Sequence, residues 1–122
     1  MQNDRVVDID HRAFQFALRI VKLCTQLIES SGVSKTIGYQ LLKSGTAVGA
    51  ILEEAHAAQD KPEFAHKMSH ALKEARQANY WLRLLLEANV IPENRLAPLL
   101  QESTEIMKIL GAITANTYRS LS

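Results

Sequence analysis

Apolar residues recur at intervals of three or four along nearly the whole chain, and short polar segments interrupt this spacing at three points. Such spacing is typical of amphipathic α-helices that turn one face to a core. It predicts four helices at about residues 11–30, 35–58, 61–89 and 93–119. Helices joined by loops of about three to five residues pack against their neighbours in opposite directions. We therefore expect a single domain over residues 1–122 with an all-α fold, an antiparallel up-down-up-down four-helix bundle.

Residues that favour helix starts mark several of these boundaries. Asp10 is a candidate N-cap for the first helix and Ser34 for the second, because their side-chain oxygens accept hydrogen bonds from free backbone N–H groups. Asp60 precedes the third helix and Glu63 follows three residues later, which is a capping-box pattern. Pro98 is expected in or near the first turn of the fourth helix, where proline is tolerated.

The first helix carries two apolar stripes, about 120° apart at 100° per residue. One stripe consists of Phe14, Ala17, Leu18, Val21, Cys24 and Ile28, and the other of Phe16, Ile20, Leu23 and Leu27. An apolar arc this wide exceeds what one small bundle core needs. Either neighbouring helices wrap this helix, or it also meets another subunit.

The second helix contains Gly45 and Gly49 in its middle, four residues apart. Each glycine costs about 0.5–1 kcal/mol of helix stability relative to alanine. The pair therefore indicates a position where a larger side chain does not fit. Together they form a flat strip that another helix backbone can approach closely, either within the bundle or across a subunit contact. A membrane-dimer role is excluded because Lys43, Glu53 and Glu54 flank the strip.

The charge balance leaves room for a local basic surface only. Lys and Arg together number 14 and Asp and Glu 13, which excludes a strongly cationic protein that coats nucleic acid. The outward side of the third helix nevertheless gathers basic and aromatic side chains. The candidate face for a nucleic acid or a protein partner consists of Lys67, Lys73, Arg76, Trp81 and Arg83. Its alternative interpretation is an ordinary solvated helix face.

The sequence contains no complete pattern for a catalytic or metal-binding site. Two Glu-x-x-His patterns, Glu53/His56 and Glu63/His66, match half of a di-iron carboxylate site, but the helix ends at the same level of the bundle supply too few carboxylates for the other half. The single cysteine, Cys24, lies on an apolar stripe and is expected in the core. We predict no catalytic residue, no metal and no cofactor, and hence a protein that is not an enzyme.

The N-terminal segment is polar and acidic, which is unlike a signal or transit peptide. Nowhere does the chain offer the run of about 18 apolar residues that a membrane-spanning helix needs. The sequence therefore predicts a cytoplasmic location and no membrane partner.

The segment at 40–50 reads QLLKSGTAVGA and resembles the signature of a bacterial four-helix-bundle family. Its founding members are encoded within intervening sequences of 23S ribosomal RNA genes. Further segments that carry the resemblance lie at 16–21, 53–55, 64–68, 71–75, 80–85 and 107–110. Ile51 departs from the pattern, since the family commonly has Asn there.

The resemblance implies an antiparallel four-helix bundle that assembles as a homopentamer, and it implies no enzymatic activity. A related branch, the accessory proteins of diversity-generating retroelements, binds a reverse transcriptase and RNA and is characteristically basic, unlike this chain of net charge +1. We therefore expect a non-enzymatic oligomeric scaffold that binds nucleic acid or a nucleic-acid-processing protein. The alternative is a protein–protein interaction module with no nucleic-acid role.

Overall fold

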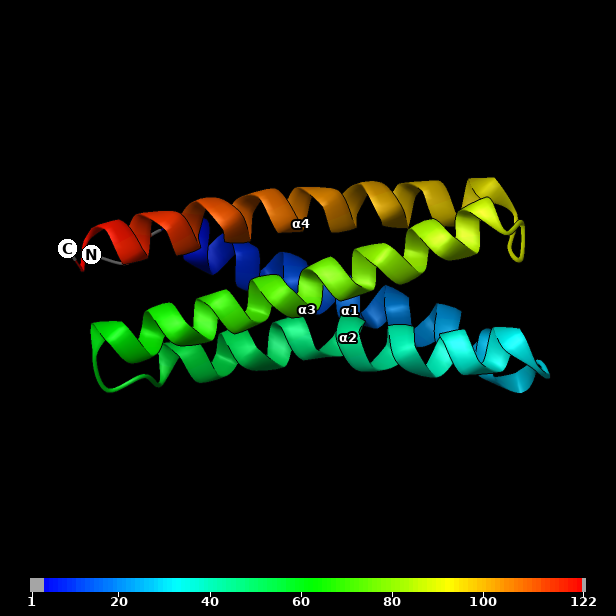
Figure 1. The fold of residues 1–122 in the computed structure, drawn as a ribbon, viewed down its shortest axis with the longest axis horizontal. Helices are drawn as coiled ribbons and strands as arrows, with labels where there is room; N and C mark the ends of the chain where they lie inside the picture. The colour runs from blue at the N-terminus through cyan, green and yellow to red at the C-terminus, as the bar shows by residue number, and fades with distance from the viewer. Residues whose placement is uncertain (1–3, 122) are drawn as a thin grey trace.

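The computed structural model describes residues 4–121 and forms a bundle of four long helices (Figure 1). The helices are α1 (Asp4–Glu29), α2 (Val33–His56), α3 (Lys61–Glu87) and α4 (Glu93–Arg119). Each helix packs against the next along the chain, and α4 closes the bundle against α1, so that α1 and α3 lie on one diagonal. The predicted all-α fold, an antiparallel four-helix bundle, is confirmed.

Two helices begin earlier than the sequence analysis expects. α1 starts at Asp4 rather than near residue 11, so Asp10 lies within the helix and is not its N-cap. Nothing between these positions breaks a helix, and Ile9 is fully buried, which extends the amphipathic pattern by one turn before Ala13. α2 starts at Val33, which places Ser34 inside its first turn. Gly32 occupies the N-cap position with φ 68°, a left-handed conformation that glycine adopts without strain.

The start of α3 follows the expected chemistry. The Asp60 side chain accepts a hydrogen bond of 2.9 Å from the backbone N–H of Glu63. The Glu63 carboxylate in turn accepts one of 3.0 Å from the backbone N–H of Gln59. Pro98, however, lies inside α4 beyond its first turn, where its ring removes the hydrogen bond that the carbonyl of Asn94 would otherwise accept.

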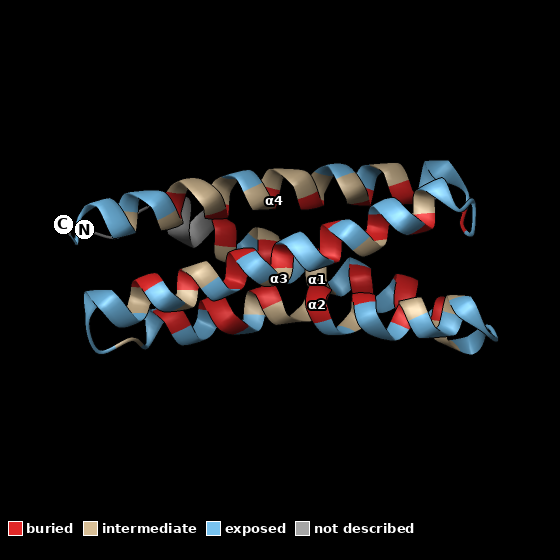
Figure 2. Ribbon diagram, viewed as in Figure 1, coloured by how far each residue is buried: buried red, intermediate tan, exposed pale blue. Residues whose placement is uncertain are grey.

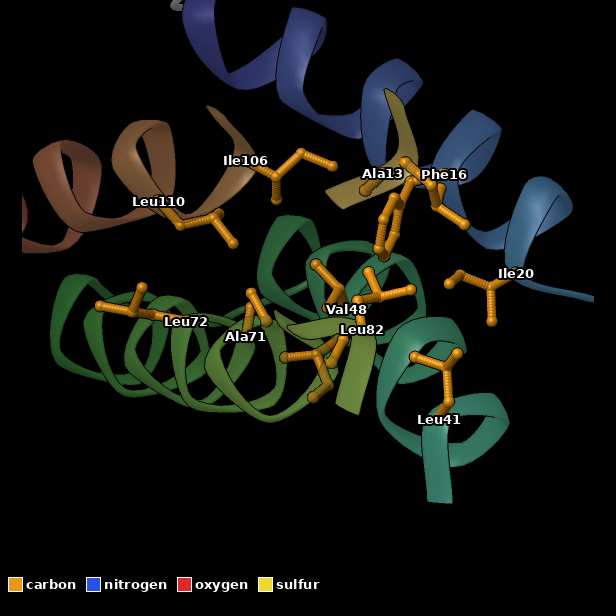
Figure 3. Packing of buried hydrophobic residues seen from close by; sticks show 14 of the residues in the cluster. Ala13, Phe16, Ile20, Leu41, Val48, Ala71, Leu72, Leu82, Ile106 and Leu110 are labelled. Atoms are coloured by element: carbon orange, nitrogen blue, oxygen red, sulfur yellow. The ribbon is translucent and has the colours of Figure 1, made fainter. Parts of the chain in front are cut away.

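The core consists of one continuous cluster of apolar side chains from all four helices (Figures 2 and 3). Of the two apolar stripes on α1, the one with Phe16 and Ile20 faces this core, and both side chains are at most 2% exposed. The other stripe mostly faces outward. Ile51 is also buried in the cluster, so the position where the resemblance expects Asn contributes to apolar packing here.

Three glycines of α2 lie along its contact with α1. A Cβ atom at Gly45 would lie 2.9 Å from both γ-carbons of Ile20, and one at Gly38 would lie 2.9 Å from Cβ of Leu27. Both positions are too tight for a side chain. A Cβ atom at Gly49 would meet the backbone of Ala13 at 3.7 Å, an ordinary van der Waals separation. The close approach of the two helices therefore depends on Gly38 and Gly45, while Gly49 has room for a methyl group.

Candidate functional site

An apolar face covers the outer side of α1 and the adjoining part of α2. Phe14, Leu18 and Val21 lie at i, i+4 and i+7 on α1, which places them on one side of the helix, and their exposed fractions are 63%, 42% and 42%. Next to them, a half-open cleft of about 320 Å³ lies between the two helices. The residues that line this cleft are Asp10, Phe14, Ala17, Thr46, Gly49, Ala50 and Glu53. We call the three exposed side chains and this cleft the α1–α2 face.

Two carboxylates and a histidine border the α1–α2 face. Asp10 of α1 and His56 in the last turn of α2 form an ion pair through Oδ2 and Nε2. The other oxygen of Asp10, Oδ1, is buried and has no hydrogen-bond partner among the described residues. Partial burial raises the pKa of Asp10 above its ordinary value, His56 lowers it by a smaller amount, and Glu53 raises it slightly further. The rim is therefore polar around a largely apolar cleft.

The charged face that the sequence predicts on α3 divides into two groups, and three of its members make contacts within the bundle. Lys67 donates a hydrogen bond of 2.6 Å from Nζ to the carboxylate of Glu54 on α2, which raises the pKa of Lys67 and lowers that of Glu54. Nε of Arg83 donates one of 2.9 Å to Oδ1 of Asn79. Trp81 is half-buried against the core and meets the Tyr80 ring edge-on, with 5.1 Å between ring centroids.

The other two members of that face lie together. Lys73 and Arg76 line a shallow hollow of about 500 Å³ on α3, together with His66 and His70. Neither Lys73 nor Arg76 forms an ion pair with a residue in the described part of the chain. We call these four side chains the α3 hollow. It is a compact basic surface, with the carboxylate of Glu74 beside it at 3.6 Å from Nε2 of His70.

A buried polar cluster between α3 and α4 was not predicted from the sequence. Asn79 is only 6% exposed, and its Nδ2 donates hydrogen bonds of 3.2 Å to the hydroxyls of Ser103 and Thr104. At the same level of α4, Arg12 of α1 and Glu102 form a two-pronged ion pair of 2.7 and 3.0 Å. Hydrogen bonds of this kind fix how neighbouring helices are aligned along their axes, and hence hold the outer faces in register.

The described side chains, those of residues 9–121, offer no metal centre, since no three His, Cys, Asp or Glu side chains among them gather at one point. His56 contacts Asp10, and His66 faces the α3 hollow, so the two Glu-x-x-His patterns serve different surfaces. Cys24 is fully buried, and burial raises the pKa of its thiol to about 12, which suppresses the reactive thiolate. None of the helices in the described chain is both long and apolar enough to cross a membrane.

Comparisons with known proteins give the family. Residues 5–112 match the family described as 23S rRNA-intervening sequence protein. A crystal structure from Bacteroides thetaiotaomicron, of a protein with unknown function from the S23 ribosomal protein family, is 34% identical; the match covers 91% of this chain and 98% of that one, with a TM-score of 0.83. No curated protein matches. Since the family match spans most of the bundle, the chain belongs to the 23S rRNA-intervening sequence protein family.

Proposed function

We propose that this protein is a non-enzymatic scaffold that assembles with copies of itself through the α1–α2 face. The observation that carries the proposal is the exposure of Phe14, Leu18 and Val21 beside a cleft of about 320 Å³. A contiguous apolar surface next to a hollow, rimmed by charged groups, is typical of a protein–protein contact. Neither the family nor its structural relative carries the name of an enzyme.

The exposed apolar side chains of this face supply part of the free energy that a stable contact needs. Complete burial of one large apolar side chain contributes about 1.5–3 kcal/mol. Phe14, Leu18 and Val21 keep between 42% and 63% of their surface exposed in one chain. Covering the rest therefore contributes roughly 2–4 kcal/mol per subunit before the cleft is counted. The resemblance drawn from the sequence favours a ring of five subunits.

Light scattering on the purified protein tests the assembly. We expect a mass that is a multiple of 13.6 kDa at micromolar concentration, and a shift toward 13.6 kDa in Leu18→Glu, which places a charge on the apolar face. Gln77→Glu on the exposed side of α3 is the matched control, because it adds the same charge elsewhere and leaves the mass unchanged. A wild-type mass of 13.6 kDa, or a Leu18→Glu mass equal to that of the wild type, contradicts the proposal.

For the partner of this scaffold we propose nucleic acid, bound at the α3 hollow. Lys73 and Arg76 are unpaired among the described side chains, and a ring of subunits repeats their charge around the assembly. The family description refers to an intervening sequence of 23S rRNA, and the description of the structural relative refers to a ribosomal protein family. Contacts of lysine and arginine with phosphate carry no base information, so the binding is expected to be salt-sensitive and independent of sequence.

Retention of RNA in a gel-shift salt series tests this second part. We expect the double variant Lys73→Gln/Arg76→Gln to bind more weakly and with a flatter salt dependence. Lys67→Gln is expected to matter less, because Glu54 already holds that ammonium group. Phosphate contacts are strong at about 50 mM salt. If the wild-type protein retains neither RNA nor DNA there, the nucleic-acid proposal fails and the alternative of a protein–protein interaction module replaces it.

A further inference from the structure

A second basic surface lies on another side of the bundle, between α1 and α4. These two helices pack together less extensively than the other neighbouring pairs. In Figure 1, α1 begins near α4 and tilts away from it toward α2, so the two helices diverge toward the end of the bundle where α4 starts. There a hollow of about 230 Å³ is lined by Arg19, Lys22, Gln26 and Arg95 above the apolar side chains of Leu23 and Leu99.

This hollow continues into a second one of about 190 Å³, which shares Gln26 and Arg95 with it and adds the hydroxyls of Ser30 and Ser34. We call the joined hollows the α1–α4 groove. From Arg19 to Ser30 the groove follows α1 for about 16 Å, at 1.5 Å of rise per residue. It is therefore an elongated, open groove rather than a point site, and it reaches Ser34 in the first turn of α2.

The charge in the groove is of one sign. Among the side chains that the structure describes, no carboxylate lines either hollow. Arg19, Lys22 and Arg95 form no ion pair with any residue that the structure describes, in contrast to Lys67 with Glu54. Nη2 of Arg95 donates a hydrogen bond of 2.7 Å to Oε1 of Gln26, which holds the guanidinium across the groove from α4 to α1. Its remaining N–H groups are available to an anionic ligand.

We propose that the α1–α4 groove binds the sugar-phosphate backbone of a single-stranded nucleic acid. Three cations along an open groove match the regular charge of successive phosphates, and the amide and hydroxyl groups of Gln26, Ser30 and Ser34 match sugar oxygens. The described residues of the lining include no aromatic side chain on which a base could stack, so we expect the groove to bind without regard to base sequence. The proposal rests on the nucleic-acid role proposed above and assigns it a surface separate from the α3 hollow.

Fluorescence anisotropy with a labelled oligouridylate of about 12 nucleotides tests the assignment. We expect the double variant Arg19→Gln/Lys22→Gln, which keeps the Arg95–Gln26 hydrogen bond, to weaken binding roughly tenfold at about 50 mM salt. Adding Arg95→Gln removes a third cation. The slope of log K against log salt is then expected to be about 2 less steep than in the wild type, since each phosphate contact on a single strand contributes about 0.7 to its magnitude. Circular dichroism and light scattering establish that each variant keeps its fold and its assembly.

The control triple variant Lys35→Gln/Lys61→Gln/Lys108→Gln removes the same charge from exposed positions outside the groove. A loss in the control equal to that in the groove variant overturns the proposal, since general charge then explains the binding. Equal competition by an oligoglutamate of similar length also overturns it, in favour of an acidic protein segment.

The same assay separates this proposal from the one for the α3 hollow. Loss of binding in Lys73→Gln/Arg76→Gln, with the groove variants unaffected, supports the α3 hollow and overturns the groove. The reverse pattern supports the groove and removes the role of the α3 hollow. If the wild-type protein does not bind the oligouridylate, both nucleic-acid proposals fail. The proposed assembly through the α1–α2 face is tested separately, by the measured mass alone.

Discussion

Alanine at Gly45 and alanine at Gly49 are expected to change stability in opposite directions, although the two glycines lie four residues apart in the same helix. At Gly45 the new Cβ atom would lie 2.9 Å from both γ-carbons of Ile20. These atoms sit next to the backbone of a β-branched side chain that is fully buried, so they cannot rotate away. At Gly49 the nearest atoms are 3.7 Å away, in the backbone of Ala13.

The magnitudes follow from two opposing effects. Replacing glycine by alanine inside a helix contributes about 1 kcal/mol of stability at either position. Overpacking at Gly45 costs about 1–3 kcal/mol, which leaves a net loss of about 1 kcal/mol. Gly49→Ala incurs no such cost and is expected to gain about 0.5–1 kcal/mol. The two variants should thus differ by about 2 kcal/mol in the free energy of unfolding.

Urea unfolding followed by far-UV circular dichroism measures this difference, at one protein concentration for all variants. Ile20→Ala removes both γ-carbons and supplies a further control. In that background Gly45→Ala is expected to be neutral or stabilising, because the atoms with which it collides are gone. If Gly45→Ala is as stable as Gly49→Ala in the wild-type background, the close approach of α1 and α2 is not the reason for glycine at position 45.

Other consequences of the structure are open to similar measurements. Asn79→Ala is expected to destabilise the bundle by about 1–3 kcal/mol in urea unfolding, because it removes the partner of Ser103 and Arg83, whereas Asn116→Ala on the exposed side of α4 should change little. The thiol of Cys24, whose pKa burial raises to about 12, should react with a thiol reagent far more slowly in the folded protein than in urea; equal rates contradict its burial. The raised pKa of Asp10 means that ionisation of this carboxyl costs stability: its contribution is present below the ordinary value of 3.8 and is lost as pH rises through the higher folded value. The wild type should therefore lose stability relative to Asp10→Asn as pH rises above the ordinary value of 3.8, and a relative gain contradicts the assignment.

The sequence predicts the helices well where local chemistry decides them. Asp60 and Glu63 cap α3 through the hydrogen bonds that their spacing implies. The predicted start of α1 was wrong. Asp10 is a good N-cap residue, but nothing before it breaks the helix, and the helix continues back to Asp4. The sequence also could not choose between the two apolar stripes of α1, because both have helical spacing and only contacts with other helices decide which one is buried.

The candidate surfaces depend still more on contacts between distant residues. Lys67 belongs to a basic face by periodicity, but its ammonium group reaches Glu54, which lies 13 residues earlier on α2. Arg95 and Gln26 are 69 residues apart, so no local pattern shows that they meet across a groove. The role of Gly38 could have been predicted from the sequence, since it precedes Gly45 by seven residues and therefore lies on the same side of the helix.

The mass of the assembled protein tests the central claim most directly, because every proposed binding surface is repeated around an assembly built on the α1–α2 face. Light scattering of the wild type and of Phe14→Glu at micromolar concentration measures both whether the protein assembles and whether assembly depends on this face. We predict about five times 13.6 kDa for the wild type and a smaller mass for the variant with its helical content unchanged. A wild-type mass of 13.6 kDa contradicts the account, because Phe14, Leu18 and Val21 would then remain exposed to water in the native protein.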